Sequence, residues 1–205
     1  MPQKVATFEK VSREEYDKTV KKTLEEFNKR GIMVSDIIFV PYDEIKLPKR
    51  STASSAGYDI YSGMDVTPDK MIKKAMRMPA GTRSLDIVVD YHIMVPTFIK
   101  CKIDPDWVLH IYPKSGLATK KRTKLMNTVG IIDADYYGNQ SNEGHIMIPL
   151  EMYQITNGDG SPNYDDLVIP KNTKLMQGIF LPYGITTDDE CTEERTGGFG
   201  STGLS

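Results

Sequence analysis

The sequence predicts an all-β sandwich or barrel preceded by one helix. Three observations support this fold class. Short apolar runs dominate the chain after residue 35, turn-forming Gly, Pro, Asn and Asp separate these runs, and helical periodicity is confined to residues 12–30. The length of 205 residues is enough for one domain with a substantial core.

The helix is predicted by a start signal, an apolar stripe and a stop signal. Ser12 and Glu15 have the spacing of a capping box, and Gly31 follows basic residues as a stop. We expect the stripe to pack on the body of the domain, with docking into a partner groove as the alternative. The stripe consists of Tyr16, Val20, Leu24 and Phe27.

Strands are predicted for the apolar runs that follow, and two polar stretches between them are interpreted as loops or insertions. The runs are residues 37–42, 85–95, 107–113, 145–150 and 178–183, and the insertions are residues 65–83 and 156–166. The end of the chain turns acidic and then glycine-rich, which predicts a flexible tail. We therefore expect a helical extension over residues 1–35, a β-barrel domain over 36–186 and a tail over 187–205.

Composition narrows the classes of partner. Lys and Arg total 26 against 28 Asp and Glu, so no overall charge bias favours nucleic acid or an anionic membrane. The chain has no apolar run of the ~18 residues that a spanning helix needs, and its start lacks the apolar centre of a signal peptide. We expect a cytoplasmic protein, with free thiols at Cys101 and Cys191 because neither has ligand-spaced neighbours.

The most informative motif is GIIDADYYGN, at residues 130–139. Asp133 and Asp135 are two positions apart, so an extended strand would point both carboxylates to one face, where a cation, a water or a proton could sit between them. The alternative is a β-hairpin with solvated Asp tips, since Asp, Gly and Asn are ordinary turn formers.

The run PKSGLA, at residues 113–118, brings a Lys, a Ser hydroxyl and a Gly amide into one turn after a predicted strand. Lys114, Ser115 and Gly116 could hold phosphate oxygens at the start of a short helix. Four basic residues follow closely, and a solvated basic face is the alternative reading.

A second glycine-rich phosphate candidate, RTGGFGSTG at residues 195–203, lies near the end of the chain. Successive glycine amides could form an anion-binding nest, and hydroxyls and one aromatic ring could add contacts. The alternative is a disordered tail, although an Arg and a lone Phe within it favour docking onto a ligand. The residues concerned are Arg195, Phe199, Gly200, Ser201 and Thr202.

Single polar residues within apolar surroundings complete the set of candidates. Asp59, in STASSAGYDI, could anchor a hydrated Mg²⁺ ion. Gln177, in KLMQGIF, is either a satisfied core amide or a ligand donor. His92, His110 and His145 lack ligand spacing, and we interpret them as structural or surface residues.

Taken in order, AGYDI, PKSGLA, NTVGIIDADYYGN, KLMQGIF and RTGGFGSTG resemble the five ordered motifs of the trimeric dUTPase family, in the style of its bacterial and phage members. The resemblance spans about residues 46–203 and leaves the N-terminal helix outside. It implies a jelly-roll-like β-barrel of the β-clip type, a homotrimer whose subunits share each active site, and Mg²⁺-dependent hydrolysis of dUTP to dUMP and pyrophosphate. That activity keeps uracil out of DNA and supplies dUMP for dTMP synthesis.

The resemblance also implies a role for each matched residue. Asp133 would be the general base that activates the water attacking the α-phosphorus, Asp59 would contact Mg²⁺ through water, and Tyr136 would pack beneath the deoxyribose. Substrate would also be bound by Asn127, Gly130 and Ile132 at the uracil, by Lys114, Ser115, Gly116 and Gln177 at the phosphates, and by Arg195, Phe199, Gly200, Ser201 and Thr202 of a closing tail. Arg195 stands one residue closer to Phe199 than the family pattern has it, which makes its reach to the γ-phosphate a separate question.

Two other functions fit part of this pattern. A dCTP deaminase resembles the same fold, but it needs a glutamate acid/base where this chain offers Asp133. A nucleotide-gated regulatory protein of phage type would use dUTP binding to order the tail and control a protein partner. Partner capture that depends on dUTP and persists without hydrolysis would identify that function.

Overall fold

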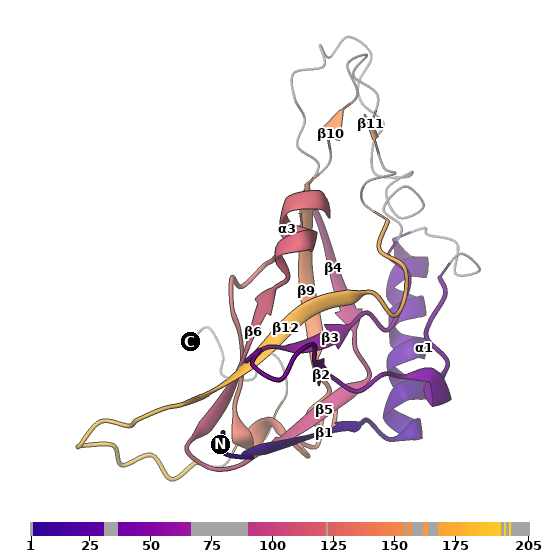
Figure 1. Ribbon diagram of the computed structural model, residues 1–205. Helices are drawn as coiled ribbons and strands as arrows, with labels where there is room; N and C mark the ends of the chain where they lie inside the picture. Colours follow the sequence, from indigo (N-terminus) through magenta and orange to yellow (C-terminus); the bar gives the residue numbers. More distant parts are fainter. Residues whose placement is uncertain are drawn as a thin grey trace.

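A computed structural model describes residues 2–30, 37–66, 90–121, 123–153, 155–156, 162–163, 168–193, 195 and 197 (Figure 1). Most of the regular structure is β-sheet, which confirms the predicted fold class. The strands are β1 (Ala6–Lys10), β2 (Lys49–Arg50), β3 (Tyr58–Tyr61), β4 (Asp90–Pro96), β5 (Ile99–Ile103), β6 (Trp107–Pro113), β7 (Thr123–Leu125), β8 (Gly130–Ile132), β9 (Met147–Tyr153), β10 (Ile155–Thr156), β11 (Pro162–Asn163) and β12 (Lys174–Pro182). The helices are α1 (Arg13–Lys29) and α3 (Ser115–Lys121), with 3-10 turns η2 (Tyr42–Glu44) and η3 (Ala134–Tyr136).

Two antiparallel sheets form the body of the protein. The larger has the strand order β2-β3-β12-β6-β8, and the smaller has the order β4-β9-β7. The inward side chains of both sheets are almost all aliphatic, and their burial supplies the main driving force for folding. Fully buried core residues include Ile60, Leu109, Ile111, Ile148 and Leu150.

Helix α1 flanks the sheets on one side, with β1 and β5 at its foot (Figure 1). The predicted helix is confirmed, and Phe27 is buried while Tyr16, Val20 and Leu24 pack half-buried against the core. The most deeply buried line on the helix is nevertheless polar in three of its four members, which are Glu15, Thr19, Thr23 and Phe27. The face that α1 presents to the domain is therefore partly a hydrogen-bonding surface.

The capping box predicted at the start of α1 is half correct. The Ser12 hydroxyl accepts a hydrogen bond from the Glu15 amide at 3.0 Å, as an N-cap should. The box also predicts a reciprocal bond from the Ser12 amide to the Glu15 carboxylate. That prediction is wrong, because the Ser12 amide donates to the Glu143 carboxylate at 3.0 Å. The Glu15 carboxylate instead accepts from Thr19 and Lys18, so the helix start is capped from a loop 131 residues away.

The remaining differences from prediction have local causes. Residues 37–42 form no strand beyond one bridge between Phe39 and Met64, because Pro41 cannot donate to a ladder and is followed by η2. Strands β1 and β5 were not predicted, and they pair with each other, from Ala6–Ile103 to Lys10–Ile99. Most of the two insertions lies outside the described residues, apart from the β10-β11 pair.

The described part of the chain also bears on the predictions about membrane-spanning helices and free thiols. Neither described helix has both the length and the apolarity to cross a bilayer. Cys101 is buried and Cys191 is exposed, and both are free thiols, as predicted.

Candidate active site

The larger sheet brings together four of the five motifs. Gln177 on β12 pairs with Asp59 on β3 on one side and with Tyr112 on β6 on the other. Strand β8, which leads into the Asp133 turn, pairs with β6 through Gly130 and Ile111. The motifs that are far apart in the sequence thus lie on neighbouring strands of one antiparallel sheet.

Asp59 lies in a cationic pocket. Its side chain is only 5% exposed, and its carboxylate pairs with Lys114 and, at 2.6 Å, with Lys174. The Ser51 hydroxyl donates to the same carboxylate at 2.8 Å. Burial raises the pKa of Asp59, but the hydrogen bonds from the two lysines and Ser51 outweigh it and lower the pKa to about 2. Asp59 is therefore a fixed negative charge that orients two ammonium groups.

The chain leaves this pocket through an exposed turn at the start of α3. The Lys114 carbonyl accepts hydrogen bonds from the Leu117 and Ala118 amides, which fixes the turn. Ser115 and Gly116 are both exposed, and a side chain at Gly116 would meet no atom within 4 Å. Hydroxyl and backbone groups here face open space that a phosphate chain can occupy.

The Asp133 turn places two carboxylates on one cation. Asp133 is extended and precedes η3, so Asp135 is part of a 3-10 turn rather than of the strand that was predicted. The carboxylates still converge, because the Arg195 guanidinium lies 3.1 Å from Asp133 and 3.4 Å from Asp135. Of the three occupants that the sequence left open, a cation, a water or a proton, the structure places a cation there, the guanidinium of the fifth motif, but the extended strand expected for Asp135 is wrong.

Tyr136 lies directly behind this ion pair. Its side chain is buried, and its hydroxyl donates to the His145 carbonyl at 2.9 Å and accepts from the Asn142 amide at 2.8 Å. Burial raises the pKa of Tyr136, so the phenol keeps its proton at neutral pH. The Arg195 guanidinium stands over the ring, 5.2 Å from its centroid, which places the tail against the face that the resemblance assigns to the sugar.

The turn before β8 carries the remaining predicted base contacts. Asn127 is exposed, and its carbonyl accepts from the Val129 amide at 2.6 Å around Thr128, whose φ is 64°. Gly130 is pressed against Ile111, since a Cβ there would lie 3.2 Å from the Ile111 side chain. Ile132 is buried, so only its backbone is available to a ligand.

The described residues form two clusters rather than one site. Lys114 follows Pro113 at one end of β6, whereas Asp133 follows Ile132, which pairs with Leu109 near the other end. Val108, the neighbour of Leu109 on β6, marks the level of Asp133 in the sheet. Lys114 and Val108 are six residues apart, which corresponds to about 20 Å of strand at ~3.3 Å per residue. A single chain therefore keeps the phosphate candidates apart from Asp133, Tyr136 and Arg195. Phe199, Gly200, Ser201 and Thr202 lie outside the described residues.

Two features of the site were missed in the sequence. Lys174 reaches Asp59 because the register of β12 against β3 shifts between Lys174 and Met176, and such a bulge leaves no clear sequence signal. The loop of residues 137–145 also holds Tyr136, through Asn142 and the His145 backbone. The reading of His145 as structural is correct, because it is buried between α1 and Phe98.

The described residues contain no cluster of three or more His, Cys, Asp or Glu side chains that could hold a metal ion by themselves. Both oxygens of Asp59 are engaged by ammonium groups or Ser51. Mg²⁺ typically binds through one or two carboxylates together with substrate phosphates and water. This donor set fits an ion that arrives with a triphosphate better than one caged by the protein.

Known proteins resemble this chain in sequence and in fold. No protein-family model matches it. The deoxyuridine 5'-triphosphate nucleotidohydrolase of Lactococcus lactis is 37% identical over 161 residues, which cover 78% of this chain and 89% of that protein. The same enzyme of Haemophilus ducreyi is 32% identical over 166 residues, covering 78% and 88%. The crystal structure of dUTPase from Streptococcus mutans superposes with a TM-score of 0.50 at 27% identity, covering 73% of this chain and 97% of that one.

Proposed function

This chain belongs to the dUTP nucleotidohydrolase family, and from that premise we propose that it hydrolyses dUTP to dUMP and pyrophosphate with Asp133 as the general base. The observation that carries this mechanism is the exposed Asp133 carboxylate, which a single guanidinium holds in place beside Asp135 and Tyr136. A carboxylate that is 52% exposed is open to the attacking water, whereas both oxygens of the buried Asp59 already have protein partners. The second cluster, around Asp59, supplies charge for the phosphates.

In the proposed reaction Asp133 accepts a proton from a bound water while the water oxygen attacks the α-phosphorus. The bond between that phosphorus and the oxygen bridging to the β-phosphorus breaks, and pyrophosphate leaves with the electron pair. Such in-line displacement depends on positioning of the water and neutralisation of the leaving group. General-base catalysis of this kind is typically worth ~10²–10⁴ in rate.

Arg195 has two successive partners in this proposal. Before substrate binds it pairs with Asp133 and Asp135 and covers the Tyr136 ring. A triphosphate carries more negative charge than the two carboxylates, so we expect the guanidinium to move onto the phosphates and release Asp133 for the water. The movement would also uncover the ring face, against which the deoxyribose would pack without room for a 2′-hydroxyl.

The cluster around Asp59 would bind the phosphate chain. Lys114 and the exposed Ser115 and Gly116 offer an ammonium, a hydroxyl and a backbone amide, and the half-buried Gln177 side chain lies one strand away. Asp59 would keep Lys114 extended toward the ligand. The exposed Asn127 side chain and the backbone of Gly130 and Ile132 would read the uracil edge.

We propose Mg²⁺ as the cofactor, bound mainly through the phosphates of dUTP. When bound, the ion would neutralise charge on the triphosphate. Asp59 would reach it only through water, since both carboxylate oxygens already have protein partners.

A homotrimer would join the two clusters. The ~20 Å between Lys114 and Asp133 along β6 exceeds the length of a triphosphate, so groups from different chains would have to complete each site. Ile131 on the edge strand β8 is 59% exposed and Met126, just after β7, is 47% exposed, and exposed apolar side chains suit a subunit contact. Light scattering should give a trimer for the wild type, and Ile131→Glu should give an inactive smaller species. A fully active monomer would contradict this assembly.

The tail beyond residue 186 would close over bound dUTP, with Phe199 on the uracil and Gly200, Ser201 and Thr202 near the phosphates. We propose residues 1–35, 36–186 and 187–205 as extension, barrel domain and tail, and the cytoplasm as the compartment. A regulatory protein partner would be compatible with this arrangement, and direct binding of nucleic acid or membrane is not expected.

The proposed activity is tested by pyrophosphate release from dUTP and from each of the four standard deoxynucleoside triphosphates and UTP, with Mg²⁺ and with EDTA. We expect rapid release from dUTP alone, abolished by EDTA. Equal rates for dUTP and dTTP, or deamination of dCTP without pyrophosphate release, would overturn the proposal.

A further inference from the structure

The loop of residues 137–145 is built tightly against the backbone of Tyr136. Near its end the loop turns back through two consecutive residues with positive φ, Glu143 at 59° and Gly144 at 84°. A Cβ at Gly144 would lie 2.7 Å from the Tyr136 carbonyl oxygen, so only glycine fits there. The Asn139 amide donates to that same carbonyl at 2.8 Å. A displacement of this loop must therefore move Tyr136.

The loop also fixes the phenol of Tyr136. Asn142 donates to the hydroxyl at 2.8 Å, and the hydroxyl donates to the His145 carbonyl at 2.9 Å. The Asn142 side-chain oxygen is itself held by the Gly144 amide at 3.2 Å and by Asn139 at 2.8 Å. Asn142 and His145, which bond the Tyr136 hydroxyl, both belong to the loop.

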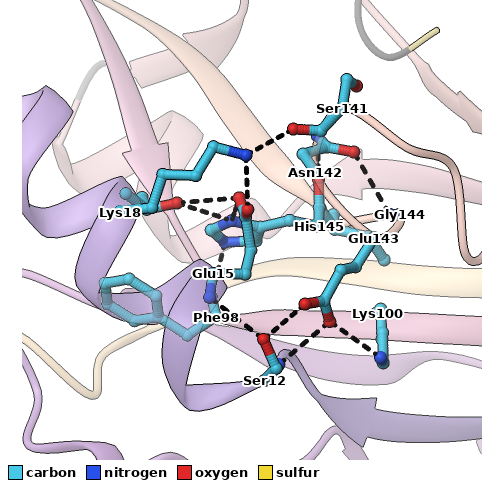
Figure 2. A network of polar contacts seen from close by, with 12 residues as sticks. Ser12, Glu15, Lys18, Phe98, Lys100, Ser141, Asn142, Glu143, Gly144 and His145 are labelled. Carbon is cyan, nitrogen blue, oxygen red and sulfur yellow. Dashed lines mark hydrogen bonds and ion pairs between the residues drawn. The ribbon is translucent and has the colours of Figure 1, made fainter.

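The far side of the loop is fastened to the N-terminal segment, as Figure 2 shows. Glu143 accepts from the Ser12 amide at 3.0 Å, from the Ser12 hydroxyl and from Lys100 at 3.0 Å. Burial raises the pKa of Glu143, but the bonds from Ser12 and Lys100 outweigh it, so the group stays ionised at neutral pH. The start of α1 and the loop therefore cap each other.

His145 fastens the loop to α1 at a second point. Its Nε2 atom accepts from the Phe98 amide at 2.9 Å, so the ring proton of the neutral form is on Nδ1. Nδ1 lies 3.3 Å from the Thr19 hydroxyl, which in turn donates to Glu15 at 3.1 Å. Burial lowers the pKa of His145, which keeps the ring neutral and this direction of hydrogen bonds intact.

Polar contacts, with a cavity between them, join α1 to the loop. A cavity of about 290 Å³ opens between α1 and the loop, bordered by Lys22, Met94 and Asn142 among others. Lys18 spans the rim, donating to the Ser141 carbonyl at 2.6 Å and to Glu15 at 2.9 Å. Hydrogen-bonded buried groups define one orientation more strictly than apolar contacts do. The loop is thus oriented by α1 rather than merely covered by it.

We propose that the N-terminal segment, through Ser12 and Glu15, positions the loop of residues 137–145 and thereby sets the orientation of Tyr136 that discriminates deoxyribose from ribose. Ser12, Glu15, Glu143 and Asn142 are positioning residues in this proposal, because they act through Tyr136. The inference rests on the proposed function of Tyr136 beneath the sugar.

A double-mutant cycle tests the positioning role. The readout is the selectivity ratio, which is kcat/KM for dUTP divided by kcat/KM for UTP. Glu143→Ala should lower this ratio about three- to tenfold, the usual range for residues that act through a network. Glu143→Gln, which can still accept from Ser12, should stay within about twofold of the wild type. Glu14→Ala is the matched control, because it makes the same change at an exposed position of α1 and should leave the ratio unchanged.

The cycle is completed in a Tyr136→Phe background, which removes the hydroxyl that the loop holds. There Glu143→Ala should lower the ratio by a smaller factor than in the wild type, since the loop then holds only the backbone of residue 136 and no longer the hydroxyl. Should Glu143→Ala fold poorly in melting curves, Ser12→Gly serves instead, because glycine is accepted at an N-cap. It removes the hydroxyl contacts with Glu143 and with the Glu15 amide but keeps the backbone bond to Glu143.

The outcomes separate two kinds of failure. An unchanged ratio in both Glu143→Ala and Ser12→Gly, or equal effects with and without the Tyr136 hydroxyl, would overturn the positioning role while dUTP hydrolysis stands. Absence of dUTP hydrolysis in the wild type would instead overturn the proposed function itself.

Discussion

The pocket of Asp59 and the turn of Asp133 hold the two most important carboxylates of the candidate site in opposite environments. Asp59 has a side chain 5% exposed, sits between Lys114 and Lys174, and has its pKa lowered to about 2. Asp133 has a side chain 52% exposed and one cationic partner, Arg195, which comes from the tail. The first charge is fixed by the sheet, whereas the second is covered by a tail residue that we propose moves onto the substrate.

The difference suggests a division of labour. A general base must reach a water and accept a proton, which an exposed carboxylate with a removable partner can do. A buried carboxylate with two permanent cations is a poor base, but it orients those cations and fixes their charge. We therefore assign the chemistry to the turn and the phosphate charge to the pocket.

The strongest way to break this comparison is Asp133→Asn. The amide keeps the shape of the side chain but cannot take the proton, so kcat should fall ~10²–10⁴-fold while dUTP binding stays within about tenfold. Asp135→Asn is the matched control, because it removes the neighbouring carboxylate that shares Arg195. Turnover of Asp133→Asn above about a tenth of wild type, or an equal loss in Asp135→Asn, would contradict the assignment of the base.

Removing the tail tests whether the partner of Asp133 belongs to the reaction. A chain ending at Glu190 lacks Arg195 and should lose on the order of 10²-fold in turnover, comparable to loss of a transition-state donor. It should keep the oligomeric state of the wild type by light scattering, because the truncation begins after β12 and leaves both sheets intact. Near-normal turnover in the truncated protein would show that the tail lies outside the active site.

Asp59→Asn should act on binding more than on chemistry. Without its carboxylate the two lysines lose their anchor, so KM for dUTP should rise about tenfold, while kcat should change less than in Asp133→Asn. Initial-rate kinetics on both variants measure the contrast. A larger fall in kcat for Asp59→Asn than for Asp133→Asn would reverse the proposed division of labour.

Acid unfolding gives the smallest and most local test. The pKa of Asp59 is near 2 in the folded protein, below the ordinary value of 3.8. Ionised Asp59 therefore contributes to the free energy of unfolding above about pH 4, and this contribution is lost as the pH falls toward 2. The shift corresponds to about 2 kcal/mol at most. Urea unfolding between pH 5 and 2.5 should show less pH dependence in Asp59→Asn than in wild type, and equal pH dependence in the two proteins would contradict this role of Asp59.

The sequence predicted the parts of this comparison that depend on local pattern. The strand run of residues 107–113 and the helix follow from residue pattern, whereas Asp133 and Asp135 converge through a 3-10 turn that the spacing did not predict. It did not reveal the pairing of Lys174 with Asp59, because a shift in strand register turns that lysine toward the carboxylate. Nor could spacing predict that Glu143 caps Ser12 from 131 residues away, since long-range partners are chosen by packing.

The fate of solvent oxygen tests the central claim, attack of a protein-activated water on the α-phosphorus, most directly. In a single turnover of dUTP in H₂¹⁸O, with enzyme in excess, mass spectrometry should find one ¹⁸O atom in dUMP and none in pyrophosphate. Label in pyrophosphate would place the attack on the β-phosphorus and contradict the account of the Asp133 turn.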